Sequence, residues 1–117
     1  MTPTILIVDD HPSFRAVARV LLETEGFDVV GVATDGESAV SETLRLAPDV
    51  VLLDVGLPDM NGFEVAARLR AAGAESAIVF TSSRDGSDFG PLIAESGARG
   101  FIAKPDLSGG AVRALVG

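Results

Sequence analysis

Residues 4–9 have the sequence TILIVD, in which four consecutive apolar residues, three of them β-branched, are followed by an acidic residue. A strand that is apolar on both faces is typical of a parallel sheet covered by helices on both sides. Residues 49–54, with the sequence DVVLLD, repeat this pattern and again end on an acidic residue. We therefore expect both segments to be buried strands of one parallel sheet.

The rest of the chain alternates short apolar runs with stretches whose apolar residues recur at helical spacing. Further strands are expected at 29–33, 77–81 and 100–103. Helices are expected at 12–26, 39–47, 63–72 and 107–116, together with a short helix that begins near Pro91. Five repeated βα units predict the α/β class, with a doubly wound sheet of five parallel strands.

Composition narrows the possible functions. The 117 residues are expected to form one domain, 1–117, with no effector domain in this chain. There is no cysteine, and the single histidine is His11, so zinc–thiolate and multi-histidine metal sites are excluded. A net charge of −8 argues against direct binding of nucleic acid. Without a long apolar stretch or a signal peptide, we expect a cytoplasmic protein that does not enter membranes.

Charged and hydroxyl residues stand at the carboxyl ends of four expected strands. They are Asp9-Asp10, Asp54, Thr81-Ser82 and Lys104, the only lysine of the chain. Ligands of open α/β sheets bind beyond the carboxyl ends of the strands. We therefore expect these side chains to form one site.

The chemistry of such a site follows from its charges. Two carboxylates 4 Å apart repel by about 4 kcal/mol at an effective dielectric constant near 20, and proteins keep such clusters when a cation neutralises them. Oxygen ligands suit Mg²⁺, with Mn²⁺ as a second possibility. A carboxylate beside a divalent ion can attack a phosphoryl group, while a hydroxyl and an ammonium hold the other oxygens. The residues thus suggest phosphoryl transfer to an aspartate.

The ordered set of motifs resembles the receiver domain of two-component response regulators. The matching residues are Asp9-Asp10, Asp54, Leu57-Pro58 with Gly62, Thr81 or Ser82, and Lys104-Pro105. The resemblance covers residues 4 to about 116 and implies a (βα)5 fold with the flavodoxin-like strand order 2-1-3-4-5. It also implies a phosphoacceptor switch in a phosphorelay, rather than a conventional enzyme.

The resemblance assigns a role to each residue. Asp54 would take a phosphoryl group from a phosphohistidine of a sensor histidine kinase or histidine phosphotransfer protein, and would lose it by slow self-hydrolysis. Asp10, Asp54 and the backbone carbonyl of Gly56 would bind Mg²⁺, with Asp9 acting through water. Lys104 and the strand-four hydroxyl would hold the phosphoryl oxygens.

The resemblance also implies how a signal leaves the site. Thr81 or Ser82 and the aromatic Phe101 would carry the response to the face formed by strand four, helix four and strand five, where an unknown output partner would bind. A cis peptide bond between Lys104 and Pro105 would aim the lysine into the site.

Several choices stay open from the sequence. Strand length favours Thr81 as the switch hydroxyl, whereas the spacing to Lys104 favours Ser82. His11 is expected to be solvated rather than a ligand, and the acidic segments 23–25 and 85–88 are expected to be solvated. An alternative function is a phosphorylation-independent pseudo-receiver that serves as a protein docking module. A phosphate- or flavin-binding domain of the same fold would need a Gly- or Ser-rich loop after the first strand, where Asp9-Asp10 stand.

Overall fold

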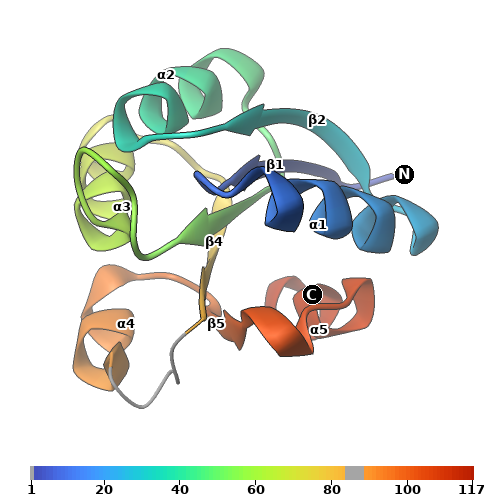
Figure 1. The fold of residues 1–117 in the computed structure, drawn as a ribbon. Coiled ribbons are helices and arrows are strands. Elements are labelled where there is room, and N and C mark those ends of the chain that lie inside the picture. Colours follow the sequence, from blue (N-terminus) through green and yellow to red (C-terminus); the bar gives the residue numbers. More distant parts are fainter. Residues whose placement is uncertain (1, 84–88) are drawn as a thin grey trace.

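The computed structural model, which describes residues 2–83 and 89–117, contains one sheet of five parallel strands in the order β2-β1-β3-β4-β5 (Figure 1). The strands are β1 (Thr4–Val8), β2 (Asp28–Ala33), β3 (Val50–Asp54), β4 (Ala77–Ser82) and β5 (Gly100–Ala103). The helices are α1 (Pro12–Thr24), α2 (Gly36–Leu46), α3 (Gly62–Ala71), α4 (Gly90–Ser96) and α5 (Gly109–Val116). The predicted fold class and strand order are confirmed. The predicted acidic segment 85–88 lies outside the described residues.

Helices cover both faces of the sheet (Figure 1). Alternate residues of β1 divide between two cores, because successive side chains of a strand point to opposite faces. Ile5 and Ile7 pack on the face covered by α1 and α5, whereas Leu6 and Val8 pack on the face covered by α2, α3 and α4. β3 and β4 follow the same alternation, so each strand presents a defined face to the site at its carboxyl end.

Local sequence explains where the helices begin. Pro12 starts α1, where its missing N–H is not needed. Asp35 caps α2 by accepting a hydrogen bond from the backbone N–H of Ser38, and Asn61 caps α3 in the same way. The N-terminus of α5 is held by Glu25, whose carboxylate accepts hydrogen bonds from the N–H groups of Gly109 and Gly110. Glu25 is exposed, as expected, but it also has this structural role.

Some predicted boundaries change. β1 ends at Val8, so Asp9 stands just beyond the strand. The last helix begins at Gly109 rather than at Leu107, because Ser108 caps it and residues Lys104–Asp106 form a separate 3-10 turn, η2. The short helix expected near Pro91 is present as α4. Within the described residues, none of the helices has the length and apolarity needed to cross a membrane.

Candidate functional site

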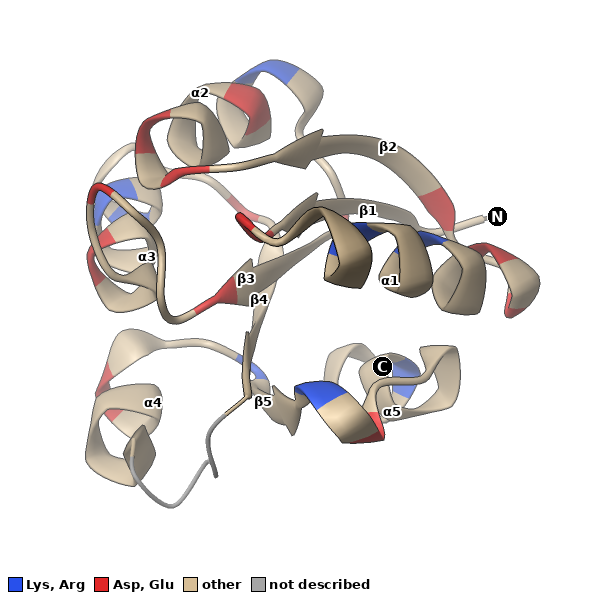
Figure 2. Cartoon of the chain, viewed as in Figure 1, with Lys and Arg blue, Asp and Glu red and all other residues tan. Residues whose placement is uncertain are grey.

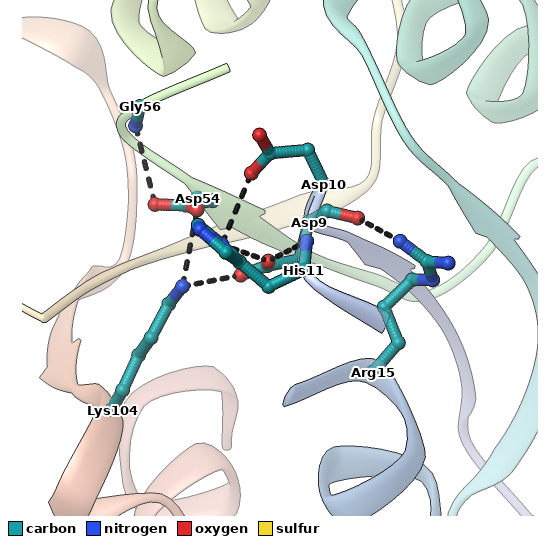
Figure 3. A network of polar contacts seen from close by, with 7 residues as sticks. All are labelled: Asp9, Asp10, His11, Arg15, Asp54, Gly56 and Lys104. Carbon is teal, nitrogen blue, oxygen red and sulfur yellow. Dashed lines mark hydrogen bonds and ion pairs between the residues drawn. The ribbon is translucent and has the colours of Figure 1, made fainter. Parts of the chain in front are cut away.

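Three charged side chains from three strands meet at the carboxyl edge of the sheet (Figure 3). The ammonium nitrogen Nζ of Lys104 lies 2.6 Å from Asp9 Oδ2 and 3.2 Å from Asp54 Oδ2. Asp9 follows β1, Asp54 ends β3 and Lys104 follows β5. Figure 2 shows this distribution along the ribbon, with acidic residues at the ends of β1 and β3 and a basic residue after β5. The parallel sheet thus brings together residues that are far apart in sequence.

These charges are held away from solvent. Asp9 is fully buried and Asp54 is 4 % exposed, while the Lys104 side chain is 14 % exposed. The ring of Phe14 on α1 lies 4.6 Å from the Lys104 nitrogen, which adds a cation–π contact. Buried charges are tolerated only when they are paired, and here two buried carboxylates share one ammonium. The arrangement therefore favours a further cation.

Asp10 and His11 form the exposed side of the cluster. His11 Nδ1 lies 3.0 Å from Asp9 Oδ1 and 3.1 Å from Asp10 Oδ1. The imidazole is 63 % exposed, in line with the expected solvation, yet it contacts both carboxylates. Arg15 on the first turn of α1 donates a hydrogen bond to the backbone carbonyl of Asp9. Sequence reasoning missed the contacts of His11 and Arg15. The only signal was that His11 directly follows two aspartates and that Arg15 lies in the first turn of the helix that starts there.

The environment shifts the pKa values in different directions. Burial raises the pKa of Asp54, and the negative charge of Asp9 raises it further. The hydrogen bond from the Gly56 N–H and the charge of Lys104 lower the pKa, but they do not outweigh burial and Asp9. Burial also raises the pKa of Asp9, but Lys104 and the backbone N–H of His11 outweigh burial, so that the pKa of Asp9 is lowered. Burial would lower the pKa of Lys104, but its two carboxylate partners raise it. Lys104 therefore stays charged, and Asp54 is the less stabilised of the two buried carboxylates.

The loop after Asp54 folds back over the end of β3. The backbone N–H of Gly56 donates to Asp54 Oδ1 at 3.2 Å, and the N–H of Gly62 donates to the carbonyl of Val55 at 2.7 Å. A Cβ atom on Gly62 would lie 2.6 Å from the carbonyl oxygen of Asp54, so only glycine fits there without a shift of the backbone. Gly56, in contrast, has open space where its Cβ would lie. This loop places a backbone N–H on the Asp54 carboxylate.

The two candidate hydroxyls point to opposite faces of the sheet. Thr81 pairs in register with Asp54 and shares the face of Val79, on the side of α1 and α5. It is 1 % exposed, and its Oγ1 has no hydrogen-bond partner within the part of the chain that the structure describes. Ser82 shares the face of Phe80, on the side of α3 and α4, and it is buried as well. Thr81 is therefore on the same face as Asp9, Asp54 and Lys104.

Phe101 is half-buried on the α4 side of β5. Its ring centroid lies 6.1 Å from that of Phe89, which in turn lies 5.9 Å from Phe63. Phe63 also contacts Phe80 at 4.7 Å. A row of aromatic rings thus runs from the first turn of α3 to β5. The aromatic residue that the sequence singled out is the last member of this row.

The predicted cis peptide bond between Lys104 and Pro105 is wrong. All peptide bonds of the described residues are trans. Pro105 lies in the first turn of η2, and the lysine side chain is long enough to reach Asp9 and Asp54 from that backbone.

The donor atoms suit a divalent cation. Asp9, Asp10, His11 and Asp54 each offer one ligand atom, and these atoms all lie within 4.8 Å of one another. Three of the four residues are carboxylates, which Mg²⁺ and Mn²⁺ prefer. Metal binding by Asp9, Asp10, Asp54 and the carbonyl of Gly56, the ligands named from the sequence, stays a prediction.

Comparison with known proteins shows which family of sequences this chain resembles. The sequence model of the response regulator receiver domain matches residues 5–110. A putative transcriptional regulator of Pseudomonas aeruginosa is 37 % identical over 100 residues, which are 86 % of this chain and 48 % of that protein. The DNA-binding transcriptional activator EvgA of Escherichia coli is 35 % identical over 101 residues, which are 86 % of this chain and 50 % of that protein. The chain spans about half the length of these curated relatives.

A solved structure shows the same likeness in three dimensions. The signal receiver domain of the putative response regulator NarL from Mycobacterium tuberculosis superposes with a TM-score of 0.88 and is 29 % identical. The match covers 99 % of this chain and 98 % of that one.

Proposed function

Because the chain belongs to the response regulator receiver domain family of two-component systems, we propose that Asp54 is its phosphoacceptor. The observation that carries this proposal is the buried Asp54 carboxylate, which lies within reach of the Lys104 ammonium and beside two further carboxylates. The phosphodonor would be a phosphohistidine of a sensor histidine kinase or of a histidine phosphotransfer protein.

The phosphoryl group would pass from the donor imidazole to Asp54 in one displacement step. A carboxylate oxygen of Asp54 attacks the phosphorus, the bond from phosphorus to the donor imidazole nitrogen breaks, and that nitrogen keeps the electron pair and takes up a proton. Lys104, which now contacts Asp9 and Asp54, is placed to pair with a phosphoryl oxygen. In the later hydrolysis, water attacks the phosphorus, the bond from phosphorus to the Asp54 oxygen breaks, and inorganic phosphate leaves while Asp54 returns to its carboxylate. The domain is thus a switch that modifies itself rather than an enzyme acting on other substrates.

A divalent cation, Mg²⁺ or Mn²⁺, would be held by Asp9, Asp10, Asp54 and the carbonyl of Gly56. When bound, it would offset the charge of the incoming phosphoryl group. The hydroxyl that holds another phosphoryl oxygen is Thr81 rather than Ser82. Its buried Oγ1 has no partner and lies on the Asp54 face of the sheet, so a phosphoryl oxygen would give it one.

The output would pass through Thr81 and Phe101. Thr81 and Phe101 lie on opposite faces of the sheet, so a movement of Thr81 toward a phosphoryl group would reach Phe101 through the backbone of β4. Phe80, the residue before Thr81, pairs in register with Phe101 on the face made by β4, α4 and β5. The output partner stays unknown. EvgA is named as DNA-binding, but this chain spans half of such relatives, and its net charge of −8 supports the prediction that it does not itself bind nucleic acid. The cytoplasmic location also stays a prediction.

A docking module that works without phosphorylation is less well supported, because the acceptor, the lysine and the hydroxyl are all present and adjacent. The test is the mass of the intact protein after incubation with acetyl phosphate and Mg²⁺. We expect wild type and Asp28→Asn to gain one phosphoryl group, since Asp28 is exposed at the start of β2. Asp54→Asn should gain none. Phosphate on the Asp54→Asn protein, or none on wild type, would overturn the proposal.

A further inference from the structure

The backbone of His11 is held by hydrogen bonds on both sides. Its backbone N–H donates to Asp9 Oδ1 at 2.8 Å, and its carbonyl accepts the first hydrogen bond of α1, from the N–H of Arg15 at 3.1 Å. Its extended backbone (φ −97°, ψ 111°) is followed by the fixed start of the helix at Pro12. The ring itself contacts Asp9 and Asp10, and Figure 3 shows it at the strand ends beside these residues.

The distances from His11 Nδ1 to the oxygens of Asp9 and Asp10 match those between neighbouring ligand atoms of a metal ion. In octahedral coordination with bonds near 2.1 Å, neighbouring ligand atoms are about 3.0 Å apart. His11 Nδ1 lies 3.0 Å from Asp9 Oδ1 and 3.1 Å from Asp10 Oδ1. An ion could therefore lie between these three atoms with little movement of the side chains.

A second observation shows that this end of the sheet lacks partners. In the described part of the chain, three buried side-chain oxygens make no hydrogen bond, and all three belong to this site: Asp9 Oδ2, Asp10 Oδ1 and Thr81 Oγ1. The first two are met only by the ion pairs with Lys104 and His11. Buried oxygens left in this condition commonly mark a place for an ion or another ligand.

We propose that His11 Nδ1 is a ligand of the divalent cation and gives the site a preference for ions that bind imidazole well, such as Ni²⁺ and Co²⁺, over Mg²⁺. The inference rests on the cation site of the proposed function. Mg²⁺ prefers oxygen ligands, whereas imidazole suits the later transition metals, whose affinities rise from Mn²⁺ to Ni²⁺. One nitrogen among three carboxylates therefore sets the choice of metal.

The experiment uses the full chain without a histidine tag, because His11 is then the only histidine. Electron spin echo spectroscopy of the Mn²⁺-loaded protein reports whether an imidazole nitrogen is bonded to the ion. We expect nitrogen modulation in wild type and in Asp28→Asn, and none in His11→Gln. Calorimetric titration should show that His11→Gln loses Ni²⁺ affinity by at least about tenfold, while its Mg²⁺ affinity changes by less than about threefold.

The outcomes separate this inference from the proposed function. Mn²⁺ that binds wild type without nitrogen modulation would refute the role of His11, even if Mg²⁺ still binds and Asp54 is still phosphorylated. An unchanged ratio of Ni²⁺ to Mg²⁺ affinity in a folded His11→Gln protein would refute it as well. A wild-type protein that binds neither Mn²⁺ nor Mg²⁺ would overturn both. The spectroscopic result on wild type does not depend on whether the variant folds.

Discussion

Replacing Lys104 by methionine would remove the one cation that, among residues 2–83 and 89–117, contacts both buried carboxylates of the site. At an effective dielectric constant near 20, the contact to Asp9 at 2.6 Å corresponds to roughly 6 kcal/mol, and that to Asp54 at 3.2 Å to roughly 5 kcal/mol. Much of this attraction is offset in wild type by the desolvation of the ammonium, whose side chain is 14 % exposed.

The net loss is smaller than the sum of the two contacts because one carboxylate can take up a proton once the ammonium is gone. Breaking a buried ion pair by removing one partner typically costs about 3–5 kcal/mol, and we expect Lys104→Met to lie in this range. Total stabilities are about 5–15 kcal/mol, so the effect should be large in a urea melt.

The urea melts are run with chelator and with excess Mg²⁺. At a hundredfold excess over its dissociation constant, an ion stabilises the folded state by about 2.7 kcal/mol, and the variant should gain at least as much as wild type because no ammonium competes. The matched control is Lys104→Met combined with Asp54→Asn, which removes one of the unpaired carboxylates and should recover part of the loss. A Lys104→Met protein within about 1 kcal/mol of wild type, or one that Asp54→Asn does not improve, would refute this reasoning.

Three further predictions concern single positions. Burial raises the pKa of Asp54 above its unfolded value near 3.8, so wild type should lose stability as the pH rises through the folded pKa. Without divalent ions, Asp54→Asn should therefore be more stable than wild type at pH 7. Curves of stability against pH that run parallel for the two proteins would contradict this. Thr81→Val removes a buried hydroxyl that has no hydrogen-bond partner among the described residues, so it should raise the free energy of unfolding by about 1–2 kcal/mol and slow phosphorylation. Ser82→Ala should be phosphorylated nearly as fast as wild type. If mass spectrometry shows that Ser82→Ala is the slower of the two variants, Ser82 is the switch hydroxyl. Gly62→Ala places a Cβ against the carbonyl of Asp54 and should lower the free energy of unfolding by about 1–3 kcal/mol. Gly56→Ala, whose Cβ would lie in open space, should lower it much less. Equal losses in thermal or urea melts would contradict this geometry of the loop after β3.

The fold could be predicted because its signals are local. The doubly apolar runs that became β1 and β3 can be buried only inside a covered parallel sheet, and Pro12 and Pro91 mark helix starts wherever they lie. The meeting of Asp9, Asp54 and Lys104 also follows from topology alone, because the carboxyl ends of parallel strands share one edge.

The features that escaped prediction depend on geometry across the chain. Glu25 caps α5 across 84 residues of sequence, and no spacing rule connects the two. The separation of Thr81 from Ser82 needed the register of β4 against β3, since a shift of one residue exchanges the two faces. Whether the ring of His11 turns to solvent or to the carboxylates depends on its side-chain conformation, which the residue order does not determine.

The two sides of the acceptor site belong to parts of the sheet with different neighbours. β3, which ends in Asp54, has a strand on either side, whereas β5, which leads into Lys104, is a four-residue edge strand that pairs only with β4. Amide hydrogens of an inner strand exchange mainly through global unfolding, while edge strands also open locally at lower free energy. We therefore expect amide exchange to be slowest in β3 and faster in β5. Each local opening would carry the lysine away from a carboxylate that stays in place, so a donor or an ion could enter without disturbing the strand that receives the phosphoryl group.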